Sequence, residues 1–250
     1  MATIKKVNCF GLQYAPDQWV CKPMMGINRL YHIHSGTGGC YHNGTHYTFL
    51  AGHLYFIPFT RHFEPYSDPA DPILHTYADF ERIPPIPCDR ILSADPAADE
   101  LAMAALAVFD AGGRQVGHLH GADLQRAENE SLWRLCAESI LYLTSFIAKE
   151  NGILEIRDPV VLKVLETLHA SIGEPLSVSQ LAADCYLSSD SLIRRFSKAV
   201  GMTPYAYFKE LRLHTALCLR AEGMDLATIA IKTGYADPSS LLHAMSKRNT

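Results

Sequence analysis

The sequence lacks the long apolar runs of a membrane protein and the cysteine spacing of a secreted one. No segment of the 250 residues approaches the roughly 18 apolar residues of a membrane span, and the opening MATIKKVNCF has no extended apolar core. The seven cysteines are odd in number and form no C-x-x-C pair, which argues against a disulfide framework. We therefore expect a cytoplasmic protein of two domains, with reduced thiols and no membrane partner.

Catalytic signatures are also missing. No catalytic triad, paired-carboxylate site or phosphate-binding loop can be found in the sequence. The sequence therefore predicts a protein that is not an enzyme and that needs no cofactor.

The chain lacks the overall basic excess of many nucleic-acid-binding proteins, because its net charge is −4. The charge is nevertheless unevenly distributed. Residues 1–154 carry 11 basic and 16 acidic residues, whereas the chain from Ser191 onward carries 9 basic and 4 acidic ones. Positive charge concentrated at one end is compatible with DNA binding by that end.

Two short helices with a tight turn between them are predicted from Leu176 to Gly201. Ser177 and Ser188 are suited to N-cap them, and Gly201 is suited to end the second one in the left-handed conformation. Apolar residues at 192, 196 and 200 recur at helical spacing, which leaves a polar and cationic opposite face. This pattern predicts a helix-turn-helix unit, although helix pairs with basic outer faces also occur in ordinary helical domains.

A second copy of the pattern makes the DNA-binding interpretation stronger. Asp225 and Asp237 are the predicted N-caps of its two helices, with Pro238 at the first position of the second. A helix from Thr203 and Pro204 to about Ala221 is expected to connect the two copies. The predicted DNA contacts on the two second helices are Ser189, Asp190, Ile193, Arg194, Arg195, Lys198, Pro238, Ser239, Leu242 and His243.

The region from about Pro159 to the end resembles the DNA-binding domain of AraC-type bacterial transcription factors. The motif residues are Ser188, Leu192, Arg194, Phe196, Gly201, Pro204, Tyr205, Arg212, Leu213, Ile229, Ala230, Gly234 and Tyr235. The resemblance implies double-stranded DNA and RNA polymerase as partners. His243 and Met245 stand where the family tends to have Arg and Phe, and the family usually continues beyond the equivalent of Thr250. A weaker second unit is therefore expected.

Short strands separated by glycines are predicted in the first part of the chain. They cover NRLYHIHSGTGG, HYTFLAGHLYFIP and Ile73–Glu81, and such spacing indicates a β-sandwich or small barrel. Their glycine and proline spacing resembles the cupin-type sensor domain of many AraC-type regulators. The expected fold class is α+β, a cupin-like β-barrel with a helical dimerisation region before an all-α domain with two helix-turn-helix units.

His32 and His34 are separated by one residue, and this H-x-H pair is similar to the start of the cupin metal motif. Alternate residues of a strand share a face, so both could ligate one ion. No Glu follows within four residues, however. Ordinary strand histidines are the preferred interpretation, and no metal site is predicted.

Effector-binding candidates lie on the strand Ile73–Glu81 and near the first strands. His75 and Tyr77 share a face of their strand, and they fall where arabinose-type sensors use a His and an aromatic residue. Lys22 falls near the ligand-binding Arg of those sensors, and Arg29 is a further cation. The resemblance implies a small polar effector such as a carbohydrate, while purely structural roles stay open.

Two helices are predicted after the barrel, from about Ala97 to Ala111 and from about Ala122 to Asn151, with a Gly-Gly turn between them. The apolar stripe from Leu132 to Ile147 either packs on the barrel or forms a homodimer interface, and the resemblance favours the interface. The expected divisions are a sensor at 1–96, a dimerisation region at 97–151, a linker at 152–158 and a DNA-binding domain at 159–250.

The sequence thus predicts a ligand-responsive, sequence-specific DNA-binding transcriptional regulator. One alternative is a metal-dependent cupin enzyme fused to a DNA-docking domain. The other is a sensor whose DNA binding is defective because of the short C-terminal end.

Overall fold

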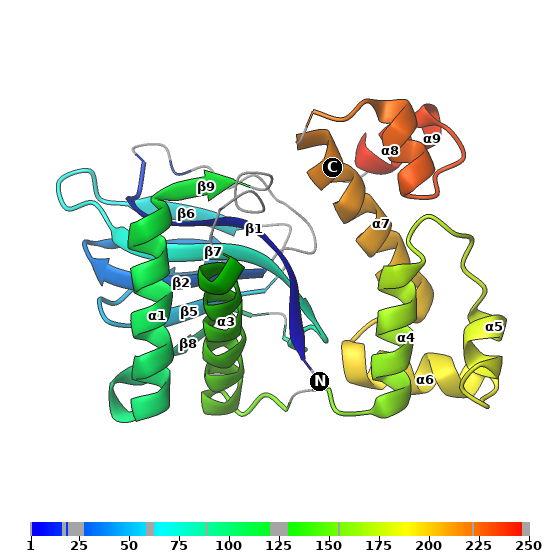
Figure 1. The fold of residues 1–250 in the computed structure, drawn as a ribbon, viewed down its shortest axis with the longest axis horizontal. Helices are drawn as coiled ribbons and strands as arrows, with labels where there is room; N and C mark the ends of the chain where they lie inside the picture. The colour runs from blue at the N-terminus through cyan, green and yellow to red at the C-terminus, as the bar shows by residue number, and fades with distance from the viewer. Residues whose placement is uncertain are drawn as a thin grey trace. The chain divides into compact units, whose positions relative to one another are not determined.

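The chain folds into two compact units, one up to residue 155 and the other from Ile156 (Figure 1). The computed structural model describes residues 2–16, 19, 28–58, 63–88, 90–120, 130–154, 156–221 and 223–246. The predicted α+β class is confirmed, with a sheet-rich first unit and a helical second one. Among the helices of these ranges, none has the length and apolar character of a membrane span. The finer divisions predicted from the sequence stay predictions.

The first unit contains two antiparallel sheets. The larger sheet has the strand order β8-β5-β2-β7-β1-β9 and the smaller one β4-β3-β6. The strands are β1 (Thr3–Tyr14), β2 (Asn28–Ser35), β3 (Gly38–His42), β4 (Thr45–Thr48), β5 (Leu54–Ile57), β6 (Phe63–Ser67), β7 (Leu74–Ile83), β8 (Leu92–Ala94) and β9 (His118–His120).

The two faces of the larger sheet bury different side chains, because successive residues of a strand point to opposite faces. Leu30 of β2 and Ala78 of β7 join the core under the helices α1 (Glu100–Val116) and α3 (Glu130–Glu150). Tyr31 and Tyr77 join a second core with residues of the smaller sheet. The unit is therefore a sandwich whose larger sheet is covered by two helices on its outer face (Figure 1).

The N-terminal strand β1 was not predicted from the sequence. It is 12 residues long and pairs with β7 over its whole length, from Thr3 opposite Ile83 to Tyr14 opposite Leu74. Its place next to β7 makes it an inner strand of the larger sheet. The partner strand lies about 60 residues further along the sequence, so local pattern alone does not reveal it.

The predicted Gly-Gly turn is wrong, because α1 runs through Gly112 and Gly113. A Cβ on Gly112 would overlap the Cys136 sulfur, and one on Gly113 would lie 2.7 Å from Thr76 Cγ2. The two glycines therefore allow α1 to approach β7 and α3 closely. Their role depends on the packing of distant elements rather than on a turn.

The apolar stripe of α3 belongs largely to the core of the first unit, which corrects the preferred interface interpretation. Leu143 and Ile147 are completely buried beneath the sheet, and Cys136 is 1% exposed. Leu135 lies outside this contact and is 52% exposed. The part of the predicted helix before Glu130 lies outside the described residues.

The second unit is a bundle of short helices whose predicted caps are confirmed. Ser177, Ser188, Asp225 and Asp237 accept hydrogen bonds from backbone amides at their helix starts, and Gly201 has the left-handed φ of 83°. Asp158, which was not predicted as a cap, does the same for the helix from Pro159. The helices are α4 (Pro159–Ala170), α5 (Val178–Ala183), α6 (Ser189–Val200), α7 (Pro204–Ala221), α8 (Leu226–Lys232) and α9 (Pro238–Ser246).

Candidate nucleic-acid interface and effector site

The helix α6 presents a charged outer face above a buried apolar one. Leu192 and Phe196 are fully buried, which fixes the rotation of the helix about its axis. The side chains predicted to meet DNA then fall on the outer side. Asp190, Arg194, Arg195 and Lys198 are exposed, and Ser189 and Ile193 are half-buried.

The exposed arginines of α6 are not equivalent. Arg195 forms an ion pair with Asp158, the N-cap of α4. Partial burial raises the pKa of Asp158, but the hydrogen bonds from Arg195 and from the backbone amides of Val160 and Val161 outweigh this effect. They hold the pKa of Asp158 below its ordinary value. Arg194 has no ion-pair partner among the residues that the structure describes. It is therefore the arginine of α6 most available to a ligand.

The second helix pair repeats this arrangement with different side chains. Ile229 and Leu241 are buried between α8 and α9, while Ser239, Leu242 and His243 are exposed and Pro238 is half-buried. The predicted contacts of α9 thus share its outer side, but they include no permanent cation. The sequence after Ser246 lies outside the described residues.

The turns of the two pairs use the same backbone conformation with different residues. Tyr186 has a φ of 57° in the first turn, and Gly234 has a φ of 68° in the second. A side chain in this region costs about 1–2 kcal/mol. Tyr186 is 97% exposed, so space is available there. At Gly234 an added Cβ would lie 2.6 Å from the Gly173 carbonyl oxygen and would overlap the Arg212 guanidinium.

Arg212 of α7 joins parts of the second unit that are distant in sequence. Its Nε donates a hydrogen bond to the Ile172 carbonyl oxygen at 2.8 Å, and a second nitrogen donates to the Glu174 carbonyl oxygen. Its guanidinium carbon also lies 4.4 Å from the centre of the Phe208 ring. The sequence motif included Arg212 but not this connecting role, which depends on the loop after α4.

The predicted effector residues of the first unit lie on the sheet face that meets the smaller sheet. Arg29 forms an ion pair with Asp79 at 3.0 Å and lies 5.5 Å from the centre of the Phe63 ring. His75 contacts Tyr31, with ring centres 4.9 Å apart. The structure thus brings Arg29, His75 and Tyr77 to one interior, whereas Lys22 lies outside the described residues.

Three further titratable groups of this interior, His75, Cys9 and Tyr77, are neutral near pH 7. Burial lowers the pKa of His75 to about 3, and burial raises the pKa of the Cys9 thiol to about 11. Burial also raises the pKa of Tyr77 well above its ordinary value. Such groups can donate and accept hydrogen bonds but are poor general bases or nucleophiles. The arrangement suits binding better than catalysis.

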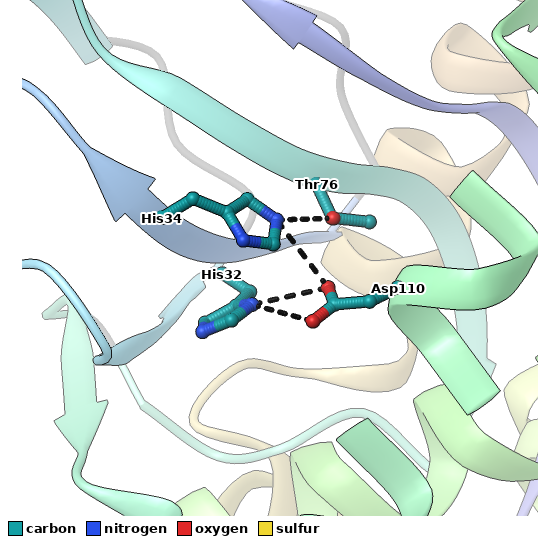
Figure 2. A network of polar contacts seen from close by, with 4 residues as sticks. All are labelled: His32, His34, Thr76 and Asp110. Atoms are coloured by element: carbon teal, nitrogen blue, oxygen red, sulfur yellow. Dashed lines mark hydrogen bonds and ion pairs between the residues drawn. The ribbon is translucent and has the colours of Figure 1, made fainter. Parts of the chain in front are cut away.

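The histidines His32 and His34 point to the opposite, helix-covered side of the sheet (Figure 2). There the carboxylate of Asp110, from α1, lies 3.0 Å from His32 Nδ1 and 3.5 Å from His34 Nε2. Sequence reasoning missed Asp110, because it searched for a Glu close to His34. The acidic residue comes instead from a position 78 residues after His32.

Two capped helix pairs linked by one long helix define the second unit as a DNA-binding domain of the tandem helix-turn-helix class. In agreement, a family model described as a helix-turn-helix domain matches residues 181–249. The resemblance of this region to the DNA-binding domain of AraC-type regulators is thereby confirmed.

Curated relatives match over less than half of the chain. The chain is 29% identical over 100 residues to the HTH-type transcriptional regulator AlkR of Acinetobacter baylyi, which covers 40% of this chain and 33% of AlkR. It is 26% identical over 117 residues to the uncharacterized HTH-type transcriptional regulator YbfI of Bacillus subtilis, which covers 47% of this chain and 42% of YbfI. The matches thus span less than half the length of these relatives.

Solved structures match over both units. ToxT from Vibrio cholerae has a TM-score of 0.58 at 11% identity, with 99% of this chain and 96% of that chain covered. ToxT bound to an unsaturated fatty acid has a TM-score of 0.55 at 12% identity, with coverage of 100% and 92%. At such identities the likeness concerns the fold alone, a β-rich N-terminal domain followed by a helical domain.

Proposed function

We propose that the protein is a ligand-responsive, sequence-specific DNA-binding transcriptional regulator. The observation that carries the proposal is the pair of helix-turn-helix units joined by α7, a helix of 18 residues. At 1.5 Å per residue, α7 is about 27 Å long. One helical turn of DNA measures about 34 Å. A rigid connector of this length suits two recognition helices in successive major grooves on one side of a duplex.

The side chains of α6 and α9 suggest unequal roles for the two helices. Exposed Arg194 can make two parallel hydrogen bonds to guanine, and Ile193 can contact a thymine methyl group. Lys198 is placed to meet phosphates. His243 has a single donor and a single acceptor when neutral, so it cannot reproduce the arginine contact. We infer that α6 determines most of the sequence preference.

Replacing Arg194 by alanine is expected to weaken DNA binding by about 1–3 kcal/mol and to relax the preference at one base position. The change His243→Ala should cost less and leave the preference nearly unchanged. Both variants are titrated on matched and mismatched duplexes at one salt concentration, after genome-wide mapping has supplied the binding site.

Lys198→Ala is the matched control for charge alone. It should weaken binding to every duplex similarly and reduce the slope of log affinity against log salt by about 1. An equal or greater loss of selectivity at His243 than at Arg194 would contradict the ranking of the two helices. Absence of binding to any duplex would instead support the alternative of a sensor with defective DNA binding.

We propose further that a small-molecule effector binds between the two sheets of the first unit. This interior combines apolar surface with a few orienting polar groups. The apolar surface comes from aromatic rings, and the polar groups are the neutral side chains of His75 and Tyr77 and the Arg29–Asp79 pair. A small polar molecule, and a carbohydrate first of all, fits this mixture. Because a ToxT structure contains an unsaturated fatty acid, long-chain carboxylates form the second class to be tested.

An effector should raise the thermal unfolding midpoint of the full chain, and Tyr77→Phe should weaken its binding about tenfold through loss of one hydrogen bond. Thermal shift with sugars and fatty acids identifies the class, and calorimetry measures the affinity. Tyr41→Phe is the control, because Tyr41 is 49% exposed on the smaller sheet. Equal affinities of the two variants would exclude Tyr77 from the binding site.

The regulator is proposed to act in the cytoplasm as a homodimer that recruits or blocks RNA polymerase. Effector binding must then favour one arrangement of the DNA-binding domains over another. The buried part of the α3 stripe cannot supply the dimer interface. Leu135 and Tyr142, seven residues apart on α3 and both exposed, are the candidates instead.

The enzyme alternative receives less support than the regulator. His32 and His34 face the covering helices rather than the interior between the sheets, so they do not form a cupin-type centre inside the sandwich. The relatives that match are transcriptional regulators. A metal-dependent turnover of candidate ligands by the purified protein would favour the enzyme.

A further inference from the structure

A second polar cluster of the first unit lies on the outer face of the larger sheet. It consists of His32, His34 and Asp110, whose potential ligand atoms all lie within 4.8 Å of one another. The two imidazole ring centres are 4.4 Å apart, and both rings face the same carboxylate (Figure 2). Thr76 Oγ1 lies 2.8 Å from His34 Nε2 and holds that ring from the next strand.

The backbone places these groups independently of any ligand. Alternate positions of β2 carry the two histidines on one face. Gly113 lets α1 lie close to Thr76 and Gly11 of the sheet, and Asp110, three residues earlier on the same turn, faces His32 of β2. All three side chains are at least partly shielded, with 11%, 22% and 13% of His32, His34 and Asp110 exposed. Their positions are therefore largely fixed before a ligand binds.

The cluster remains accessible from one side. His32 and Asp110 form part of the wall of an open pocket of about 450 Å³, which Asp95, Met103 and Arg114 also line. Besides Asp110, the lining thus contains one further carboxylate and one guanidinium. A cation that enters the pocket meets His32 and Asp110, and His34 Nε2 lies 3.5 Å from the same carboxylate. The pocket side stays free for water or a small ligand.

We propose that His32, His34 and Asp110 form a binding site for a divalent first-row transition metal ion, with at least one coordination position open to the pocket. Two imidazole nitrogens and one carboxylate oxygen suit zinc, cobalt, nickel or iron, whereas magnesium and calcium prefer oxygen ligands alone. Ligand bonds of about 2.0–2.2 Å place two ligands at most about 4.4 Å apart. Small side-chain rotations are therefore sufficient to enclose an ion.

A metal ion needs imidazole nitrogens without a proton, and it would replace the hydrogen-bond partners that His32 and His34 have in the free protein. Thr76 can donate its hydroxyl proton to His34 Nε2 in the free protein and can turn to another acceptor when an ion binds. Since His32 is on β2 and Asp110 on α1, the ion would cross-link the sheet to its covering helix. The inference does not depend on the proposed DNA binding.

Titration of the tag-free full chain tests the site, after treatment with a chelator and dialysis. Cobalt(II) is followed by visible absorption and zinc(II) by calorimetry, and one equivalent per chain is expected with a raised thermal midpoint. His34→Gln and Asp110→Asn should weaken binding at least about a hundredfold. Thr76→Val removes the hydroxyl that contacts the ligating nitrogen of His34 in the free protein, so it should not weaken binding.

His46→Gln is the matched control. His46 is exposed on β4, and its ring contacts the side chains of Tyr66 and Tyr41. The variant should bind both ions as the unchanged chain does. If Asp110→Asn fails to fold, His34→Gln decides, because the His34 side chain is partly exposed. Binding below one equivalent, or equal affinities in the unchanged chain and the His34→Gln variant, would overturn the proposal.

Discussion

Replacing Gly234 by alanine is expected to lower the free energy of unfolding of the second unit by about 2–5 kcal/mol. A side chain at a φ of 68° costs about 1–2 kcal/mol, and forcing a methyl group into occupied space costs about 1–3 kcal/mol more. The space is occupied by the Gly173 carbonyl oxygen and the Arg212 guanidinium. Urea unfolding of the full chain, followed by far-ultraviolet circular dichroism, measures the loss.

Gly201→Ala separates the two contributions. Gly201 has a similar φ of 83°, but an added Cβ would meet nothing within 4 Å. Its replacement should therefore cost only the conformational part, about 1–2 kcal/mol. If both replacements cost the same, the close contact of Gly234 with Arg212 and Gly173 contributes nothing.

The second large effect is expected at Leu143 of α3. This side chain is completely buried between α3 and the larger sheet, and Leu143→Ala should destabilise the first unit by about 2–5 kcal/mol. Leu135→Ala should change stability by less than about 0.5 kcal/mol, because Leu135 is 52% exposed. Thermal unfolding monitored in the near ultraviolet distinguishes the two variants.

The same pair of positions tests the proposed dimer. Leu135→Asp should leave the fold intact and halve the mass in solution if the exposed side of α3 forms the interface. An unchanged mass would require a different dimer surface. Similar stability losses for Leu135→Ala and Leu143→Ala would contradict the described rotation of α3.

The second unit was predictable largely because its signals are local. Ser177, Ser188 and Asp225 accept from backbone amides only two or three residues away, and Leu192 and Phe196 repeat at the helical period. The spacing of Ser177 and Gln180 also fits a reciprocal cap, but the Gln180 side chain donates to Asp184 instead. The start of this helix agrees with the prediction, because the Ser177 hydroxyl still accepts a hydrogen bond from the Gln180 backbone amide.

The first unit was less predictable because its decisive contacts connect distant segments. Strand β1 acquires its place by pairing with β7, and the apolar stripe of α3 is covered by a sheet that sequence periodicity cannot distinguish from a second protomer. Gly112 and Gly113 suggested a turn, although their actual role is close packing. The contact between Asp110 and His32 was not predicted for the same reason, because only the packing of α1 on the sheet brings these residues together.

Arg212 has a consequence for the DNA sites that such a protein could use. Its contacts with the loop after α4 and with the turn at Gly234 couple the two helix pairs through α7, so the separation of their recognition helices is fixed by the protein. One base pair inserted between two half-sites turns the second one by about 34–36° around the duplex axis. A flexible connector would let the second recognition helix move around the duplex to the rotated half-site. The rigid helix α7 would instead leave one recognition helix facing phosphates. The protein would therefore tolerate fewer spacings between half-sites, and it would lose less entropy when both recognition helices bind.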